Sequence, residues 1–188
     1  MITTPQSMTA AQLLTYHDPA DRRTELVRGR LLVSEPPGWE HGEITLRVGR
    51  SLTRWVEARE LAGQPVGRVA VGDPGFWIAR DPDTVRAPDV AFVAAERMPP
   101  GRVRGFIEHA PTLAVEVVSP ADRPGAVLAK VAQWLDAGTA LVWTIDPERR
   151  EARVYRADGS QLTIDEEGAL DGEAVLPGFT LSLASLLG

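Results

Sequence analysis

Two carboxylates stand out as residues that could do chemistry. Glu116 lies inside residues 113–118, an apolar, β-branched segment with prolines on both sides and the composition of a buried strand. Asp89 directly follows Pro88 in a second apolar segment, although Asp is unfavourable inside strands. An ionised carboxylate in a buried strand costs several kcal/mol unless a cation or good hydrogen bonds compensate it. Both carboxylates are therefore expected to have a compensating partner or a functional role.

A single lysine completes the set. Of the 20 basic residues, only Lys130 is a lysine and the others are arginines, whose planar guanidinium is a poor substitute for a compact ammonium. Two carboxylates and a backbone carbonyl offer the oxygen ligands that Mg²⁺ prefers. Water polarised by such a cation can attack phosphorus, and an ammonium can stabilise the charge that develops. The plainer alternatives are a solvated or ion-paired Glu116 and an Asp89 that serves as a turn or cap.

The elements that must position these residues follow from hydrophobic periodicity. Residues 40–60 are predicted to form a long helix that places His41 on its apolar face and Arg47, Arg50 and Arg54 on the opposite, outward face. A second helix is predicted over residues 126–137, with Lys130 at the edge of its apolar stripe. That stripe comprises Val127, Leu128, Val131, Trp134 and Leu135.

The strand pattern indicates a mixed sheet. Residues 113–146 read as strand, loop, helix and strand, a βαβ-like unit. Residues 24–33 are predicted to form a hairpin around Arg28-Gly29, in which Glu25 is either functional or simply an outward-facing residue. Residues 85–93 are predicted to form one strand, and short helices are expected over residues 8–16 and 181–187.

Composition sets further limits. A chain of 188 residues with 44% hydrophobic content is most simply one soluble globular domain, residues 1–188 with a core over about 8–187. The absence of cysteine, of a signal-peptide pattern at residues 1–5 and of any membrane-length apolar run predicts a cytoplasmic protein that does not enter a membrane. A net charge of −6 argues against wholesale coating by nucleic acid. There is no P-loop, nucleophile elbow or Cys/His zinc pattern, and no organic cofactor is expected.

Several motifs, in order and at sensible intervals, resemble those of the Uma-type family of restriction endonucleases within the PD-(D/E)XK nuclease superfamily. The resemblance covers about residues 8–187. It is carried by Pro88-Asp89, Glu116-Val117-Val118-Ser119-Pro120 and Lys130, and by residues 24–29, 86–93, 143–147 and 176–179. In the broad superfamily the lysine follows the second acid by two residues. That position is Val118 here, and Lys130 resembles the migrated equivalent. Trp134 stands where the family usually shows tyrosine.

The resemblance implies a restriction-endonuclease-like α/β fold, a mixed central sheet flanked by helices with an added N-terminal β-hairpin layer. It also implies that Asp89, Glu116 and the main-chain carbonyl of Val117 hold Mg²⁺, with Mn²⁺ as a substitute. Lys130 would orient the attacking water, Glu25 would be an auxiliary acid and His41 would line the cleft. The implied activity is phosphodiester hydrolysis, most plausibly in DNA, by a homodimer. The alternatives are an inactive nuclease-fold module that binds nucleic acid, and a structural or partner-binding domain in which Glu116–Lys130 is a buried ion pair.

Overall fold

A six-stranded mixed sheet forms the centre of the molecule. The computed structural model describes residues 7–188, so residues 1–5, on which the prediction about a signal peptide rests, lie outside it. The strand order is β10-β9-β8-β7-β6-β3, and only β7 and β8 are parallel neighbours. Their bounds are β3 Gly67–Val71, β6 Val90–Ala94, β7 Leu113–Val117, β8 Leu141–Asp146, β9 Glu151–Arg156 and β10 Gln161–Ile164.

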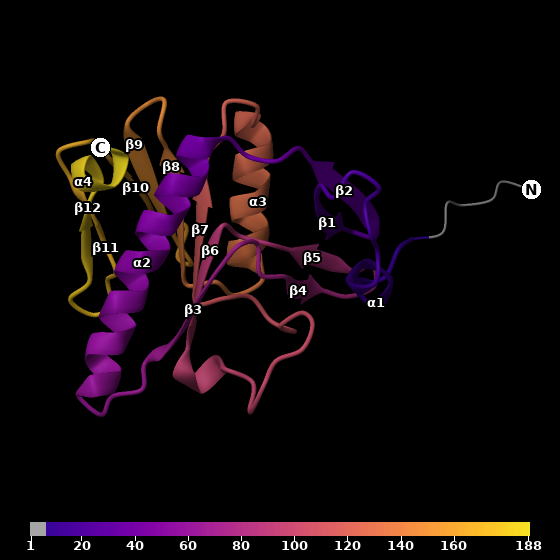
Figure 1. The fold of residues 1–188 in the computed structure, drawn as a ribbon, viewed down its shortest axis with the longest axis horizontal. Helices are drawn as coiled ribbons and strands as arrows, with labels where there is room; N and C mark the ends of the chain where they lie inside the picture. The colour runs from indigo at the N-terminus through magenta and orange to yellow at the C-terminus, as the bar shows by residue number, and fades with distance from the viewer. Residues whose placement is uncertain (1–6) are drawn as a thin grey trace, which may run out of the picture.

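Two helices cover opposite faces of this sheet (Figure 1). Helix α2 (Trp39–Leu61) packs its apolar side, including Ile44, Val48 and Leu52, against one set of alternating strand residues. Helix α3 (Pro124–Asp136) packs Val131 and Trp134 against the other set. Because α3 lies between the parallel strands β7 and β8 in sequence, the predicted βαβ-like unit is confirmed.

A second, four-stranded antiparallel sheet lies beside the first, with the order β2-β1-β5-β4. It contains the predicted hairpin, β1 (Arg23–Val27) and β2 (Arg30–Ser34), together with β4 (Phe76–Ala79) and β5 (Thr84–Arg86). The hairpin turn requires φ values of 50° at Arg28 and 73° at Gly29, a combination that suits glycine at the second position. The short helix α1 (Ala10–Leu14) begins at Thr9, whose side chain and Gln12 form a capping box.

The remaining elements close the α2 side. Strands β11 (Ala169–Asp171) and β12 (Thr180–Ser182) form a small sheet, and helix α4 (Leu183–Leu187) follows. The segment after β6 holds one 3₁₀ turn, η1 (Ala95–Arg97), and is otherwise irregular up to the bridge at Ile107. No helix within residues 7–188 is both long and apolar enough to cross a membrane.

The predicted α/β class, mixed sheet, flanking helices and hairpin layer are confirmed, and two details are wrong. Residues 85–93 are not one strand. β5 and β6 belong to different sheets, because Pro88 has no N–H to donate and restricts Ala87 before it. Leu128 is not part of the apolar stripe of α3, since 48% of its surface is exposed. The helical periodicity places it at the margin of the face that α3 buries.

Candidate active site

Asp89 lies where the chain passes from the second sheet into the central one, directly before β6. Its carboxylate is buried, and the backbone N–H of Val117 donates to its Oδ2 at 2.6 Å. This bond joins Asp89 to the end of β7, the strand that carries Glu116. Pro88 ends the strand pairing, so Asp89 lies at the junction of the two sheets and not inside a continuous strand.

Glu116 lies in β7 with its side chain on the α3 face, the same face as Ala114. Helix α3 supplies a donor to each of its carboxylate oxygens. The Lys130 ammonium donates to Oε2 at 2.8 Å, and the indole N–H of Trp134 donates to Oε1 at 2.7 Å. Residues four apart lie one turn apart on the same helix face, so one turn of α3 fixes the whole carboxylate.

Lys130 has two hydrogen-bond acceptors and one further ion-pair partner, so its ammonium is held firmly. Besides Glu116, these are the backbone carbonyl of Ala87 at 3.0 Å and Oε1 of Glu25 at 3.4 Å. Glu25 comes from β1 and accepts in addition from Arg86 and from the backbone N–H of Ala87, both at 2.8 Å. The hairpin layer thus reaches the central sheet through Glu25.

His41 and Arg23 also contact the carboxylate of Asp89. Nε2 of His41 lies 3.3 Å from Oδ2 of Asp89, and the Arg23 guanidinium lies 3.2 Å from Oδ1. Arg23 is also paired with Asp73 at 2.5 Å. The structure therefore brings together every predicted site residue, and it adds a cation and an acid from β1 and from the loop after β3.

Four residues of this cluster were not assigned to the site from the sequence: Arg23, Asp73, Arg86 and Trp134. Arg23 precedes Glu25 by two positions, so strand alternation could have placed both on one face. Trp134 follows Lys130 by one helical turn, which is an equally local signal. Asp73 and Arg86 gave no such signal, because their contacts depend on how the two sheets meet.

The predicted residues share a cleft of about 580 Å³. Its lining includes Asp89, Glu116, Val117, Lys130, Glu25 and His41, together with the loops that follow β2 and β7. The side chain of Lys130 is 17% exposed and that of Glu116 is 9% exposed. The ammonium is therefore mostly covered, yet it reaches the wall of an open cleft.

The charges around Glu116 do not fully offset the cost of burying its ionised carboxylate. Burial raises the pKa of Glu116 to about 7, and the neighbouring acids Asp89 and Glu25 add to this rise against the opposing effect of Lys130. Burial works against the charge of Lys130, but Glu116 and Glu25 outweigh it and raise the lysine pKa. Burial also opposes the ionised form of Asp89, and His41 with the Val117 N–H more than offsets it, so the Asp89 pKa is lowered.

The cluster holds more acidic than permanently charged basic side chains. Four carboxylates (Glu25, Asp73, Asp89 and Glu116) face three fixed cations (Arg23, Arg86 and Lys130), which leaves an excess negative charge when His41 is neutral. Within residues 7–188, no three or more Asp, Glu, His or Cys side chains are grouped so that they could hold a metal ion by themselves. Two carboxylates with a carbonyl suit Mg²⁺, which keeps several of its waters.

Comparisons with known proteins agree with this fold. No curated protein matches the chain. A solved structure described as a putative nuclease belonging to DUF820 from Anabaena variabilis ATCC 29413 superposes with a TM-score of 0.82. The match covers 96% of this chain and 97% of that one. At 19% sequence identity it shows a shared fold and nothing further. The sequence model of the family Uma2, described as putative restriction endonuclease, matches residues 10–184, and the chain therefore belongs to the Uma2 family.

Proposed function

We propose that this protein is a Mg²⁺-dependent endonuclease that hydrolyses phosphodiester bonds in DNA. Membership of the Uma2 family and the fold shared with a described nuclease support nuclease activity. One observation carries the proposal further. Asp89, Glu116 and Lys130 come from separate elements and converge on one cleft, with Glu116 only 2.8 Å from the ammonium. Two carboxylates and an ammonium on one cleft are groups that phosphodiester hydrolysis by a metal-activated water can use, and this supports the proposal.

Asp89, Glu116 and the main-chain carbonyl of Val117 would hold the cation. All three residues line the cleft and offer oxygen ligands, for which Mn²⁺ is an acceptable substitute for Mg²⁺. The bound metal supplies a polarised water and neutralises charge on the phosphate oxygens. His41 and the Val117 N–H keep Asp89 ionised and fix its orientation for this purpose.

Lys130 would orient the attacking water and offset negative charge in the transition state. Its raised pKa keeps the ammonium protonated, and its contacts with Ala87 and Glu25 hold it in place before substrate arrives. Glu25 serves as the auxiliary acid that positions Lys130, while Arg86 and the Ala87 N–H fix Glu25 in turn. A preorganised ammonium costs no rearrangement during reaction.

DNA is the substrate we favour, and a homodimer is the active form that we expect. Two copies would place one cleft on each strand of a duplex. Arg50 and Arg54 lie exposed on the outer face of α2 and are the best candidates for phosphate contacts. Sedimentation at several protein concentrations tests the dimer, and a purely monomeric species at micromolar concentration would contradict it.

One observation favours an inactive nuclease-fold protein that binds nucleic acid or a partner. The Lys130 ammonium already has two hydrogen-bond acceptors and a further ion-pair partner, as a purely structural ion pair would. The nuclease proposal requires in addition that the same carboxylates take up a metal. Metal binding therefore separates the two functions.

Calorimetric titration of Mg²⁺ and Mn²⁺ into the protein provides this test. The wild type is expected to bind, and Glu116→Ala is expected to lose the heat of binding. Glu108→Gln is a matched control, because Glu108 is an exposed acid paired with Arg80 and lies outside the cleft. Binding that persists in Glu116→Ala would contradict the assigned ligand. Absence of metal binding in every variant, even with DNA added, would favour the inactive nuclease-fold protein that binds nucleic acid or a partner.

A further inference from the structure

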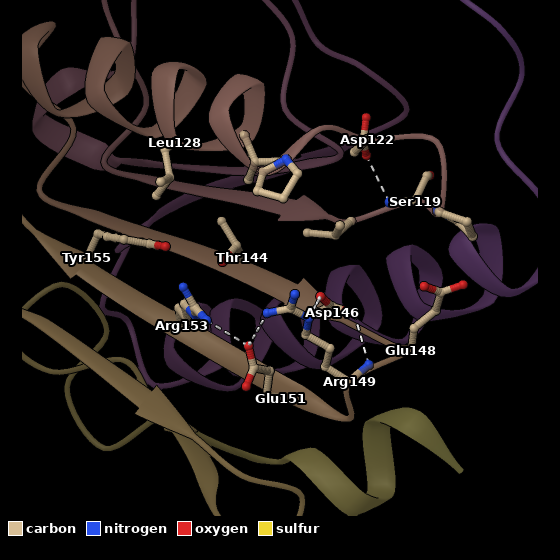
Figure 2. Close-up of a pocket in the computed structure, with 14 residues that line it drawn as sticks. Ser119, Asp122, Leu128, Thr144, Asp146, Glu148, Arg149, Glu151, Arg153 and Tyr155 are labelled. Carbon is tan, nitrogen blue, oxygen red and sulfur yellow. Dashed lines mark hydrogen bonds and ion pairs between the residues drawn. The ribbon is translucent and has the colours of Figure 1, made fainter.

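A second hollow, of about 180 Å³, lies where β7 and β8 end beneath the start of α3 (Figure 2). Val127 and Leu128 of α3 form one wall, and Thr144, Arg153 and Tyr155 of β8 and β9 form the opposite wall. Figure 2 shows Leu128 reaching from the helix toward the strands. The ends of parallel strands are a common place for ligand sites in α/β proteins.

Strand register places this hollow beside the proposed catalytic centre. Glu116 of β7 pairs with Thr144 of β8, which pairs with Arg153 of β9. Register partners share a sheet face, and neighbouring strands lie about 4.8 Å apart, so the Thr144 and Arg153 backbones lie about 5 and 10 Å from that of Glu116. The loop after β7 lines both the cleft and the hollow, through residues that include Ser119 and Asp122.

The two walls differ in chemistry. The helix wall is apolar, and its Leu128 is exposed over 48% of its surface. The strand wall carries hydrogen-bonding groups held by ion pairs, Arg153 with Glu151 at 3.0 Å and Arg149 with Asp146 at 3.6 Å. A ligand with an apolar face and a polar edge fits such a site.

Charge narrows the choice of ligand. Four carboxylates line the hollow (Asp122, Asp146, Glu148 and Glu151) against two guanidinium groups (Arg149 and Arg153). An excess of carboxylates repels a phosphate but accepts hydrogen bonds from amino groups. Within the DNA substrate proposed above, the component that suits such a lining is a base with an exocyclic amino group rather than a phosphate.

We propose that this hollow is a nucleobase subsite, which binds the base next to the cleaved phosphodiester and favours bases with an exocyclic amino group. The inference rests on the proposed nuclease function. The apolar helix wall packs against the base, and the acids of the strand wall accept from its amino edge. Cytosine, whose amino group replaces the O4 of thymine, is thus preferred over thymine. This subsite would give the enzyme a sequence preference at one flanking position.

Neutral nucleosides test the subsite without metal or phosphate. Deoxycytidine and thymidine are titrated into the metal-free protein and followed by amide chemical shifts in NMR spectra. Deoxycytidine is expected to bind about tenfold more tightly than thymidine, with shifts centred on Thr144 and Arg153. Leu128→Trp fills the hollow and is expected to abolish binding. Leu162→Trp is the matched control, because Leu162 is 50% exposed and lies on β10 outside the hollow.

Cleavage assays separate this proposal from the nuclease function. Wild type is expected to cut oligonucleotides with a preference for cytosine over thymine at one flanking position, and Leu128→Trp is expected to cut without it. Asp89→Asn should bind deoxycytidine and cut nothing. Cleavage by a wild type that neither binds deoxycytidine nor prefers cytosine would overturn the subsite and leave the nuclease standing. Deoxycytidine binding without any wild-type cleavage would reject the nuclease and keep a nucleobase site.

Discussion

Replacement of Trp134 by phenylalanine tests how the site holds its central carboxylate. The indole N–H of Trp134 donates to Oε1 of Glu116 at 2.7 Å, and the tryptophan is fully buried. Trp134→Phe deletes this donor and also removes part of a buried aromatic ring, so it needs a control that loses the same atoms without a hydrogen bond. The chain offers a matched control in Trp143, which is also fully buried but whose Nε1 has no hydrogen-bond partner among the described residues.

The two substitutions should differ by the worth of one hydrogen bond to a charged group. Such a bond contributes about 1.5–3 kcal/mol, whereas Trp143→Phe removes an N–H that is already unpaired. Trp134→Phe is therefore expected to lower the free energy of unfolding by about 1.5–3 kcal/mol more than Trp143→Phe at pH 8.5. The loss of apolar surface and the cavity left behind are of the same kind in both variants, so they largely cancel in the difference.

The difference in stability between Trp134→Phe and Trp143→Phe should depend on pH. The Glu116 pKa is raised to about 7, so the folded protein holds this proton more tightly than the unfolded chain. The contribution of Glu116 to stability is then complete below its unfolded pKa and falls as pH rises through 7. At pH 5.5 the carboxyl is mostly protonated, and the difference between the variants should shrink toward about 1 kcal/mol. Urea denaturation at both pH values measures it, and equal losses in the two variants at pH 8.5 would refute the role given to Trp134.

Three further predictions concern the charges and the metal. Lys130→Met should lower the free energy of unfolding by about 3–5 kcal/mol at pH 8, because it leaves buried carboxylates unpaired. The double variant Lys130→Met, Glu116→Gln should recover part of this loss. Urea denaturation that shows no recovery would contradict the pairing. The apparent Mg²⁺ affinity should fall up to about tenfold per pH unit below 7, because a proton on Glu116 competes with the metal, and calorimetry that gives equal affinities at pH 5.5 and 8 would contradict this. A chelator should abolish cleavage and added Mg²⁺ or Mn²⁺ should restore it, whereas gel assays that show cleavage in the chelator would exclude metal dependence.

Most of the fold could be predicted from local patterns. The periodicity of residues 40–60 predicted a helix with one apolar face, which Ile44, Val48 and Leu52 bury in the core, and the Arg28-Gly29 turn located the first hairpin. The strand over residues 85–93 was wrong, because apolar composition alone does not tell one long strand from two short strands in different sheets. Pro88 carried the signal for the break, since it removes a donor that a continuous strand would need.

The candidate site was predictable where a residue type is unusual for its position in the sequence. Glu116 in a buried strand, Asp89 after a proline and a lone Lys130 were each conspicuous, and the structure places them together. Arg86 and Asp73 were not conspicuous, because arginine and aspartate are common in this chain and their partners come from other elements. Long-range pairing of the hairpin layer with the central sheet decides these contacts, and no local pattern encodes it.

Cleavage of DNA by wild type and Asp89→Asn in Mg²⁺ tests the central claim most directly. Plasmid and oligonucleotide substrates are incubated with each protein, and Glu108→Gln, which alters an exposed acid outside the cleft, serves as the control. We expect wild type and Glu108→Gln to cut at similar rates, and Asp89→Asn to lose at least two orders of magnitude in rate while remaining folded. Wild-type activity that survives in Asp89→Asn would contradict the assignment of the centre.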